Sequence, residues 1–129
     1  MKRSTWADQW WQKARHDLDA ARVMRREGFY DTCAFLSQQA VEKAVKALWI
    51  DVMQSDPPRV HTVGPMATEL GADREVVCDI NDVVGDYMAS RYPDAAMALP
   101  ASYYTESDAE QRLVKTERVL SWVEGQWEA

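Results

Sequence analysis

Two oppositely charged residues lie close together in the segment Ser90–Met97, which reads SRYPDAAM. Arg91 and Asp94 stand on either side of Pro93, and a proline disfavours helical geometry in the residue before it. A helix that precedes this segment should therefore end there. An arginine and an aspartate at a helix end can take part in chemistry on a charged ligand, or they can act as a structural clasp. The segment alone leaves both interpretations open.

The segment Ser37–Leu48, SQQAVEKAVKAL, carries the second group of candidate residues. Residues four apart share one face of a helix, so its polar side chains form a ridge made of Gln38, Glu42 and Lys46, with Gln39 and Lys43 beside them. Glu42 and Lys46 also have the favourable order for an ion pair, which contributes only a few tenths of a kcal/mol when exposed. The ridge is either a solvated helix face or the lining of a groove that meets a partner, a ligand or the Arg91 segment.

The chain has only two histidines, and neither belongs to a recognisable catalytic motif. His16 falls on a charged part of a predicted helix and is expected at the surface. His61 is expected to cap or anchor a short helix that follows it, in preference to binding a ligand. A metal site needs three or four converging ligands, and no spacing of that kind is present. There is also no Gly-rich phosphate loop and no G-x-S-x-G turn. We therefore predict no metal site and no cofactor.

Positioning these residues requires helices, and hydrophobic periodicity predicts four long ones and no strand. They are expected over residues 5–27, 31–53, 73–90 and 106–127, with a short helix over 65–70. Candidate N-terminal caps lie at the starts of the four long helices: Ser4 or Thr5, Asp31, Asp73 and the capping box Thr105–Asp108. Short connections favour antiparallel neighbours. The predicted fold is all-α, an up-and-down four-helix-type bundle with one extra short helix, formed by a single domain over residues 1–129.

Composition supports this fold and limits the function. The chain has 129 residues, of which 47% are hydrophobic, which is typical of one domain with its own core. A net charge of -6 argues against broad electrostatic binding of nucleic acid, although a local basic patch is compatible with it. Cys33 and Cys78 fall inside apolar helical patterns and are expected to be buried free thiols. No stretch is apolar enough to span a bilayer and no signal-peptide core follows the basic start, so we expect a cytoplasmic protein without membrane contact.

Four segments, taken in order, make the chain similar to a known family: WWQKARHDLDAARVM, GFYDTCAFLSQQAVEKAVKALWI, HTVGPMATEL and SRYPDAAMALPASYYTESDAEQRLVKTERVLSWV. No single segment is specific, but together they cover nearly the whole chain and include the patterns QQAxEKxxKA and RYPD. The chain resembles the HEPN family, the higher-eukaryote and prokaryote nucleotide-binding domains, in its small stand-alone prokaryotic form. The resemblance implies a helical bundle that commonly forms homodimers, often found beside a small nucleotidyltransferase in two-part systems of toxin–antitoxin type.

Several branches of that family are metal-independent ribonucleases, which use an arginine and a histidine separated by four to six residues. The arginine stabilises a phosphate in the transition state, and the histidine moves a proton near neutral pH. After Arg91 the required positions hold Ala96, Met97 and Ala98, and no Arg-x4–6-His pair occurs anywhere in the chain. The alternative function of an endoribonuclease toxin is therefore disfavoured.

The resemblance implies instead a non-catalytic module that binds a nucleotide or RNA, or has a regulatory role, as a homodimer with a small nucleotidyltransferase as partner. Its groove would be lined at the positions that match the family motifs: Gln39, Glu42, Lys43, Lys46, Arg91 and Asp94. A purely structural alternative pairs Arg91 or Asp94 with Glu42 or Lys43 and pins the loop to the second helix. The chain also has six tryptophans, more than such a bundle buries easily, so some are expected at a dimer interface.

Overall fold

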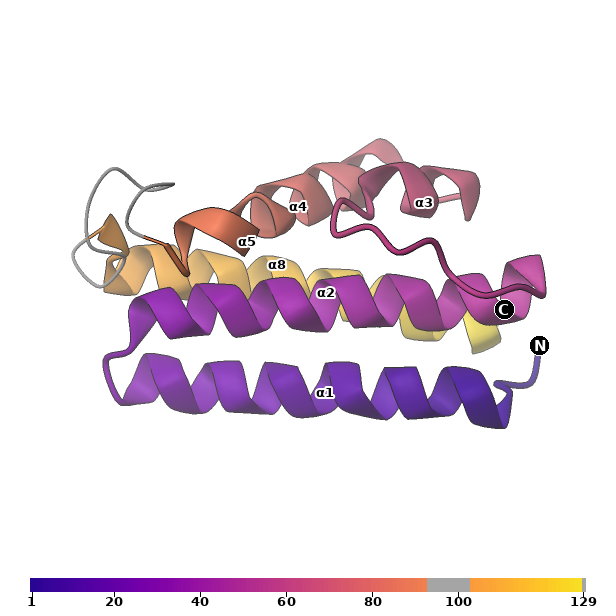
Figure 1. The fold of residues 1–129 in the computed structure, drawn as a ribbon, viewed down its shortest axis with the longest axis horizontal. Coiled ribbons are helices and arrows are strands. Elements are labelled where there is room, and N and C mark those ends of the chain that lie inside the picture. The colour runs from indigo at the N-terminus through magenta and orange to yellow at the C-terminus, as the bar shows by residue number, and fades with distance from the viewer. Residues whose placement is uncertain (93–102, 129) are drawn as a thin grey trace.

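The computed structural model describes residues 1–92 and 103–128, and this part of the chain is all-α (Figure 1). Its helices are α1 (Thr5–Arg26), α2 (Tyr30–Met53), α3 (Gly64–Glu69), α4 (Arg74–Val84), α5 (Asp86–Ala89) and α8 (Glu106–Glu128). The described residues contain no strand, which confirms the predicted fold class.

The long helices run alternately up and down, as predicted (Figure 1). α1 and α2 lie side by side and antiparallel, α8 packs against both, and α4 packs against α2 and α8. The short α3 lies beside α4. Both chain termini lie at the same end of the bundle, where the amino group of Met1 donates to the carbonyl oxygen of Trp127 at 3.1 Å.

The core forms around α2, whose small side chains allow several neighbouring helices to approach it. These side chains are fully buried: Ala40, Val41, Ala44, Val45, Ala47 and Leu48. Burial of apolar surface stabilises the fold by about 25 cal/mol per Å². Because α2 touches α1, α3, α4, α5 and α8, every element of the bundle is positioned relative to the helix that carries the polar ridge.

Most predicted helix ends are confirmed, and one predicted cap is wrong. Ser4 caps α1 and Asp73 caps α4, each accepting a backbone N–H three residues later at 3.1 and 3.0 Å. Before α8, the N–H of Thr105 donates to the carboxylate of Asp108 at 2.9 Å, and the hydroxyl of Thr105 accepts the N–H of Asp108 at 3.2 Å. Asp31 is not a cap, because α2 begins one residue earlier and Asp31 lies in its first turn.

The helix predicted over residues 73–90 is divided in two at Gly85. Glycine is unfavourable inside a helix by about 1 kcal/mol. The carboxylate of Asp86, the first residue of α5, accepts hydrogen bonds from the hydroxyl of Tyr104 at 2.7 Å and from Nε of Arg112 at 2.5 Å. These contacts hold α5 against the start of α8, and α5 in turn carries Tyr87 into the candidate site.

The two cysteines differ in their surroundings. Cys33 is buried, and this burial raises the pKa of its thiol to about 11. Cys78 is exposed, which corrects the prediction that both thiols are buried. Its position on α4 is two residues from the buried Ile80, or about 200° around the helix, so it faces away from the core. None of the helices described by the structure is both long and apolar enough to cross a membrane.

Candidate functional site

Glu42 lies at the centre of a polar cluster between α2 and the segment that precedes α3. Its Oε1 accepts a hydrogen bond from Nε2 of Gln38 at 2.8 Å and lies 2.9 Å from Nδ1 of His61. Its Oε2 accepts from Nζ of Lys46 at 3.1 Å. Gln38, Glu42 and Lys46 are all buried. The interpretation of the ridge as a solvated helix face is therefore wrong for these three residues.

The cluster favours the ionised form of Glu42 in spite of its burial. Burial alone would raise the pKa of this carboxyl, but the hydrogen bonds from His61, Lys46 and Gln38, together with the charge of Lys46, outweigh burial and hold the pKa below its ordinary value. An ionised carboxylate only accepts hydrogen bonds, so Nδ1 of His61 carries the proton that they share. The other ring nitrogen, Nε2, makes no hydrogen bond to any residue within 1–92 or 103–128.

His61 connects Glu42 to an aromatic side chain of α5. Its imidazole stacks on the ring of Tyr87, with ring centroids 3.9 Å apart and an interplanar angle of 18°. The guanidinium carbon of Arg91 lies 5.2 Å from the centre of the same ring. It also lies 5.0 Å from the ring of Phe35 and 5.1 Å from that of Tyr92. His61 and Arg91, which are far apart in the sequence, thus meet at Tyr87.

His61 is the site residue that the sequence analysis missed. It was expected only to cap or anchor the short helix, and half of its side chain (53%) is exposed beside the Glu42 carboxylate. The available signal was its position as the first residue of the segment HTVGPMATEL, which was matched to the family. His16 is exposed on α1, as predicted.

Arg91 is exposed and rests on aromatic rings, one of them Phe35 of α2, and this differs from the predicted pairing with Glu42 or Lys43. No ion pair joins Arg91 to Glu42, whose carboxylate is already taken by Gln38, Lys46 and His61. Among the described residues Arg91 has no carboxylate partner, and the cation–π contacts explain how the guanidinium stays near the site. Asp94, the other candidate of this segment, lies outside the described residues.

The two remaining ridge residues, Gln39 and Lys43, face α1. Nζ of Lys43 donates to Asp17 at 2.5 Å and to Oε1 of Gln39 at 3.1 Å. Asp17 is buried in α1 and also accepts a hydrogen bond from Lys13 at 2.8 Å. The predicted set of site residues is thus split: Glu42 and Lys46 lie with His61, whereas Gln39 and Lys43 lie at the α1–α2 contact.

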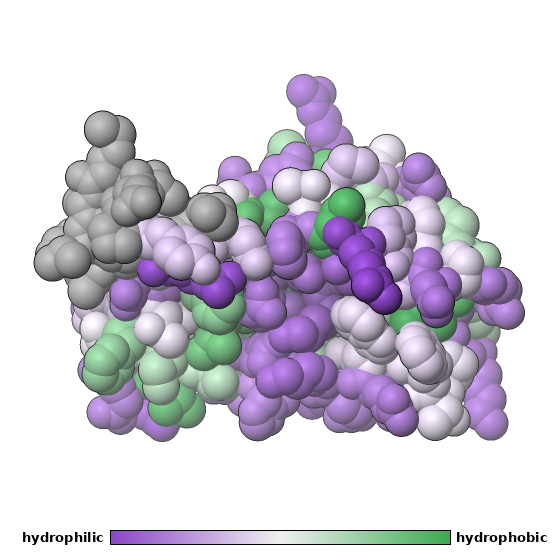
Figure 2. All heavy atoms as spheres, in the orientation of Figure 1, coloured by the Kyte–Doolittle hydropathy of each residue, from purple (hydrophilic) through white to green (hydrophobic). Residues whose placement is uncertain are grey.

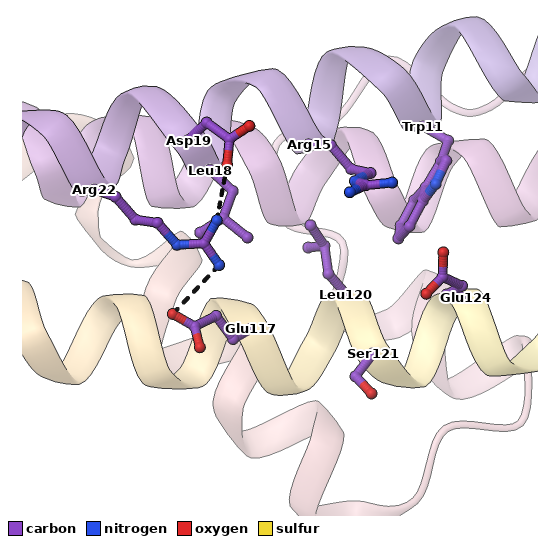
Figure 3. A pocket seen from close by; sticks show the side chains of 9 residues that line it. All are labelled: Trp11, Arg15, Leu18, Asp19, Arg22, Glu117, Leu120, Ser121 and Glu124. Carbon is purple, nitrogen blue, oxygen red and sulfur yellow. Dashed lines mark hydrogen bonds and ion pairs between the residues drawn. The ribbon is translucent and has the colours of Figure 1, made fainter.

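A separate pocket of about 290 Å³ lies between α1 and α8 (Figure 3). Its apolar lining comes from Trp11, Leu18 and Leu120, and an ion pair between Arg22 and Glu117, 3.6 Å long, spans it. None of the predicted site residues that the structure describes lines this pocket. Its helices differ from those around Glu42, so we do not count it as part of the candidate site.

The exposed groups near Tyr87 suit a ligand that combines negative charge with flat rings. A guanidinium binds phosphate oxygens through directed hydrogen bonds, and aromatic side chains stack on bases. Tyr92, beside Arg91, is 42% exposed. The face drawn in Figure 2 is largely hydrophilic, with one group of hydrophobic side chains at the end where α1 connects to α2 and smaller ones elsewhere on the face. Within the described residues, no group of three His, Cys, Asp or Glu side chains could hold a metal ion.

The fold and the site define a class of all-α bundles in which a buried glutamate contacts a half-exposed histidine, near an exposed arginine. Residues 7–126 match the family model of the HEPN domain. The chain therefore belongs to the HEPN family.

Relatives of known structure share the fold over nearly the whole chain. An archaeal HEPN homologue, ST0689, is 35% identical with a TM-score of 0.81, covering 98% of this chain and 99% of that one. TT1696 from Thermus thermophilus is 28% identical with a TM-score of 0.86, covering 95% and 98%. The HEPN domain protein TM0613 from Thermotoga maritima, at 23% identity and a TM-score of 0.72, covering 93% and 98%, is similar in fold.

One curated relative also matches by sequence. It is a protein of Methanocaldococcus jannaschii named "Putative toxin MJ1304", which is 28% identical over 123 residues. The match covers 84% of this chain and 80% of that protein.

Proposed function

We propose that this HEPN protein is the non-catalytic, nucleotide- or RNA-binding member of a two-component system of toxin–antitoxin type. It acts as a homodimer with a small nucleotidyltransferase as its partner. The family membership and the relative named as a toxin support the class of system. The geometry around Tyr87 supports the kind of ligand.

The observation that carries the proposal is the meeting of His61 and Arg91 at one aromatic ring. The imidazole stacks on Tyr87 at 3.9 Å, and the guanidinium carbon lies 5.2 Å from the ring centre. Arg91 supplies a positive charge for one phosphate, and the exposed ring of Tyr92 supplies a stacking surface for a neighbouring base. Single-stranded RNA presents both groups, whereas the bases of a duplex are already stacked on each other.

The charge of the chain limits how such binding works. A protein of net charge -6 does not attract a polyanion over long distances, so few phosphates are contacted at once. The logarithm of affinity falls with the logarithm of salt concentration, with a slope of roughly -0.7 per phosphate for single strands. We expect a slope that corresponds to about one or two phosphates.

Binding is tested with a fluorescein-labelled single-stranded RNA oligonucleotide by fluorescence anisotropy, in buffer that contains EDTA. Arg91→Ala should weaken binding about tenfold or more, because a hydrogen bond to a charged group contributes about 1.5–3 kcal/mol. Arg74→Ala is the matched control, since Arg74 is exposed at the opposite end of α4. Equal affinity of the wild type and Arg91→Ala contradicts the proposal.

The nucleotidyltransferase partner is tested through the neighbouring gene. The proposal expects a small nucleotidyltransferase to be encoded beside this chain and to co-purify with a tagged copy of it. A purified complex that contains both proteins at a fixed ratio supports the pairing. A neighbouring nucleotidyltransferase that does not bind the tagged chain contradicts this part of the proposal.

An endoribonuclease is the second candidate function, because His61 and Arg91 both lie against the ring of Tyr87 although no Arg-x4–6-His pair exists in the sequence. In such a reaction a ribose 2′-oxygen attacks the adjacent phosphorus while Nε2 of His61 accepts its proton. The P–O5′ bond then breaks, the 5′-oxygen leaves and takes up a proton, and a 2′,3′-cyclic phosphate remains. Arg91 would stabilise the charge on the phosphate oxygens.

Gel analysis of the same RNA in EDTA separates the two candidates. The non-catalytic proposal expects the RNA to be bound and intact. Cleavage that is lost in both Arg91→Ala and His61→Gln would replace it with the ribonuclease.

A further inference from the structure

A continuous series of hydrogen bonds connects Asp17 of α1 to Glu42 of α2. Nζ of Lys43 donates to Oε1 of Gln39 at 3.1 Å, Nε2 of Gln39 donates to Oε1 of Gln38 at 2.6 Å, and Nε2 of Gln38 donates to Glu42 at 2.8 Å. At the α1 end, Lys43 is held by the buried Asp17. The series therefore runs from a carboxylate in α1 to a carboxylate in α2.

The direction of these hydrogen bonds is dictated by the two charged ends. The ammonium group of Lys43 only donates, and the ionised carboxylate of Glu42 only accepts. Each amide between them must therefore accept on the Lys43 side and donate on the Glu42 side. With both amides oriented in this way, Gln38 has no alternative to donating its N–H toward Glu42.

The side chains in this series are largely shielded from water, so the orientation of each amide affects the next. The side chain of Gln38 is fully buried, and that of Lys43 is 20% exposed. In such a medium, hydrogen bonds in a chain polarise one another, and a partner that is lost is not fully replaced by water. A change at Lys43 or Gln39 should therefore affect Glu42, although neither side chain is hydrogen-bonded to the Glu42 carboxylate.

We propose that Lys43, Gln39 and Gln38 are positioning residues. Asp17 fixes Lys43, and the hydrogen bonds from Lys43 through the two amides then fix the orientation of the Glu42 carboxylate beside His61. This gives Gln39 and Lys43 a role different from that of groove residues that touch a ligand. The inference deepens the proposed function and rests on it only where RNA affinity is concerned.

Other charged groups around Glu42 must be accounted for in the test. Lys46 contributes a direct ion pair from α2, and His61 contributes a contact from the segment before α3. Tyr87 of α5 and Arg91 lie beyond His61. These groups are the same in every variant described below.

The experiment is a ¹³C NMR titration of the Glu42 carboxyl carbon, assigned by comparison with Glu42→Gln. Gln39→Leu breaks the series without any change of charge, and Lys43→Met removes its donor end. We expect both to raise the pKa of Glu42 by about 0.5–1, less than the loss of a direct hydrogen bond to a charged group would, because Gln38 still donates to the carboxylate.

Lys13→Met is the matched control. Lys13 donates to the same Asp17 carboxylate as Lys43, at 2.8 Å, but makes no hydrogen bond to Gln39. It removes the same charge and leaves the series intact, so the pKa of Glu42 should stay near the wild-type value. The comparison is repeated in about 1 M salt, where screening acts within about 3 Å and weakens purely Coulombic effects.

Two results would overturn the inference. An unchanged pKa of Glu42 in Gln39→Leu would show that the two amides do not stabilise the ionised carboxylate of Glu42. An equal rise in Lys13→Met and Lys43→Met shows a general charge effect instead. RNA affinity is measured on the same variants, and we expect weaker binding in Gln39→Leu and Lys43→Met alone. If the pKa rises as expected but the wild type binds no RNA, the proposed function fails and the inference stands.

Discussion

At the scale of single residues, the site depends on Glu42 being ionised while buried. Lys46 and Gln38 are also buried, so the charge of the carboxylate is compensated inside the protein and not by water. Removing one partner from such a group is costly, because the other is left buried without compensation. The pH dependence of stability therefore reports on this cluster.

Glu42 should stabilise the fold at neutral pH and lose this effect in acid. Its folded-state pKa is depressed below the ordinary value of 4.5, so its contribution is present above pH 4.5 and disappears as the pH falls through the lower folded-state value. Urea unfolding should show the wild type more stable than Glu42→Gln by about 1–3 kcal/mol at pH 7. The difference should shrink as the pH is lowered below 4.5.

Asp19→Asn is the control for that titration, since Asp19 is an exposed carboxylate whose pair with Arg22 lies at the surface. Its effect should stay within the small range of surface ion pairs. A stability difference for Glu42→Gln that does not change with pH contradicts the account.

The sequence predicted part of this site because part of it is local. The four-residue spacing of Gln38, Glu42 and Lys46 was enough to place them on one helix face. Their burial, and the contact with His61, were not predictable, because they depend on the segment before α3 folding back over α2. Likewise, Arg91 was recognised as a candidate, but its aromatic partners Phe35 and Tyr87 come from other elements.

At the scale of elements, α5 is the part whose position matters most for the site. It is a single turn, too short to be stable by itself. Asp86 holds it through a buried contact with Tyr104 and a partly buried contact with Arg112. Burial raises the pKa of the Tyr104 hydroxyl, and the hydrogen bond to Asp86 and the negative charge of Asp86 raise it further, so the hydroxyl remains a donor.

Loss of these contacts should destabilise the fold to different degrees. Tyr104→Phe removes one neutral donor and should cost about 1 kcal/mol. Arg112→Met leaves the carboxylate of Asp86 buried without its cation and should cost about 3–5 kcal/mol. Thermal and urea unfolding measure both effects.

Lys115→Met provides the comparison on the same helix. Lys115 pairs with Asp82 at 2.8 Å, but the Asp82 side chain is 53% exposed, so the loss should be about 0–1 kcal/mol. If Arg112→Met lowers the free energy of unfolding no more than Lys115→Met does, the contacts of Asp86 do not hold α5 in place.

Helices were predicted well because their signals are local. Ser4, Asp73 and the Thr105–Asp108 box gave the correct starts of α1, α4 and α8. The division at Gly85 was missed, since the apolar pattern continues across it from Val84 to Tyr87. The contact of Asp86 with α8 contributes to the end of α4 and the start of α5. Hydrophobic periodicity within the segment cannot predict such a contact, because it depends on another helix.

At the scale of the whole molecule, the predicted homodimer remains a prediction that the exposed side chains can test. Trp6 is 54% exposed on α1, whereas Trp11 and Trp127 are buried. Tryptophan is enriched at the centres of interfaces. We expect light scattering after size-exclusion chromatography to show a dimer for the wild type and a shift toward monomer for Trp6→Lys.

Val114→Lys is the matched control, because Val114 is similarly exposed, at 50%, on α8. It should leave the dimer intact. A monomeric wild type contradicts the homodimer, and a dimer that survives Trp6→Lys removes this tryptophan from the interface.

The central claim is that the ligand binds where His61 and Arg91 meet at Tyr87. The two histidines of the chain allow a direct measurement, because His16 lies on α1, away from this cluster, and serves as an internal reference. Single-stranded RNA is added to the protein in EDTA while the imidazole C–H signals are followed by NMR. The account predicts that the His61 signal moves, that the His16 signal stays in place, and that Arg91→Ala abolishes the change. Bound RNA that leaves the His61 signal unmoved would contradict it.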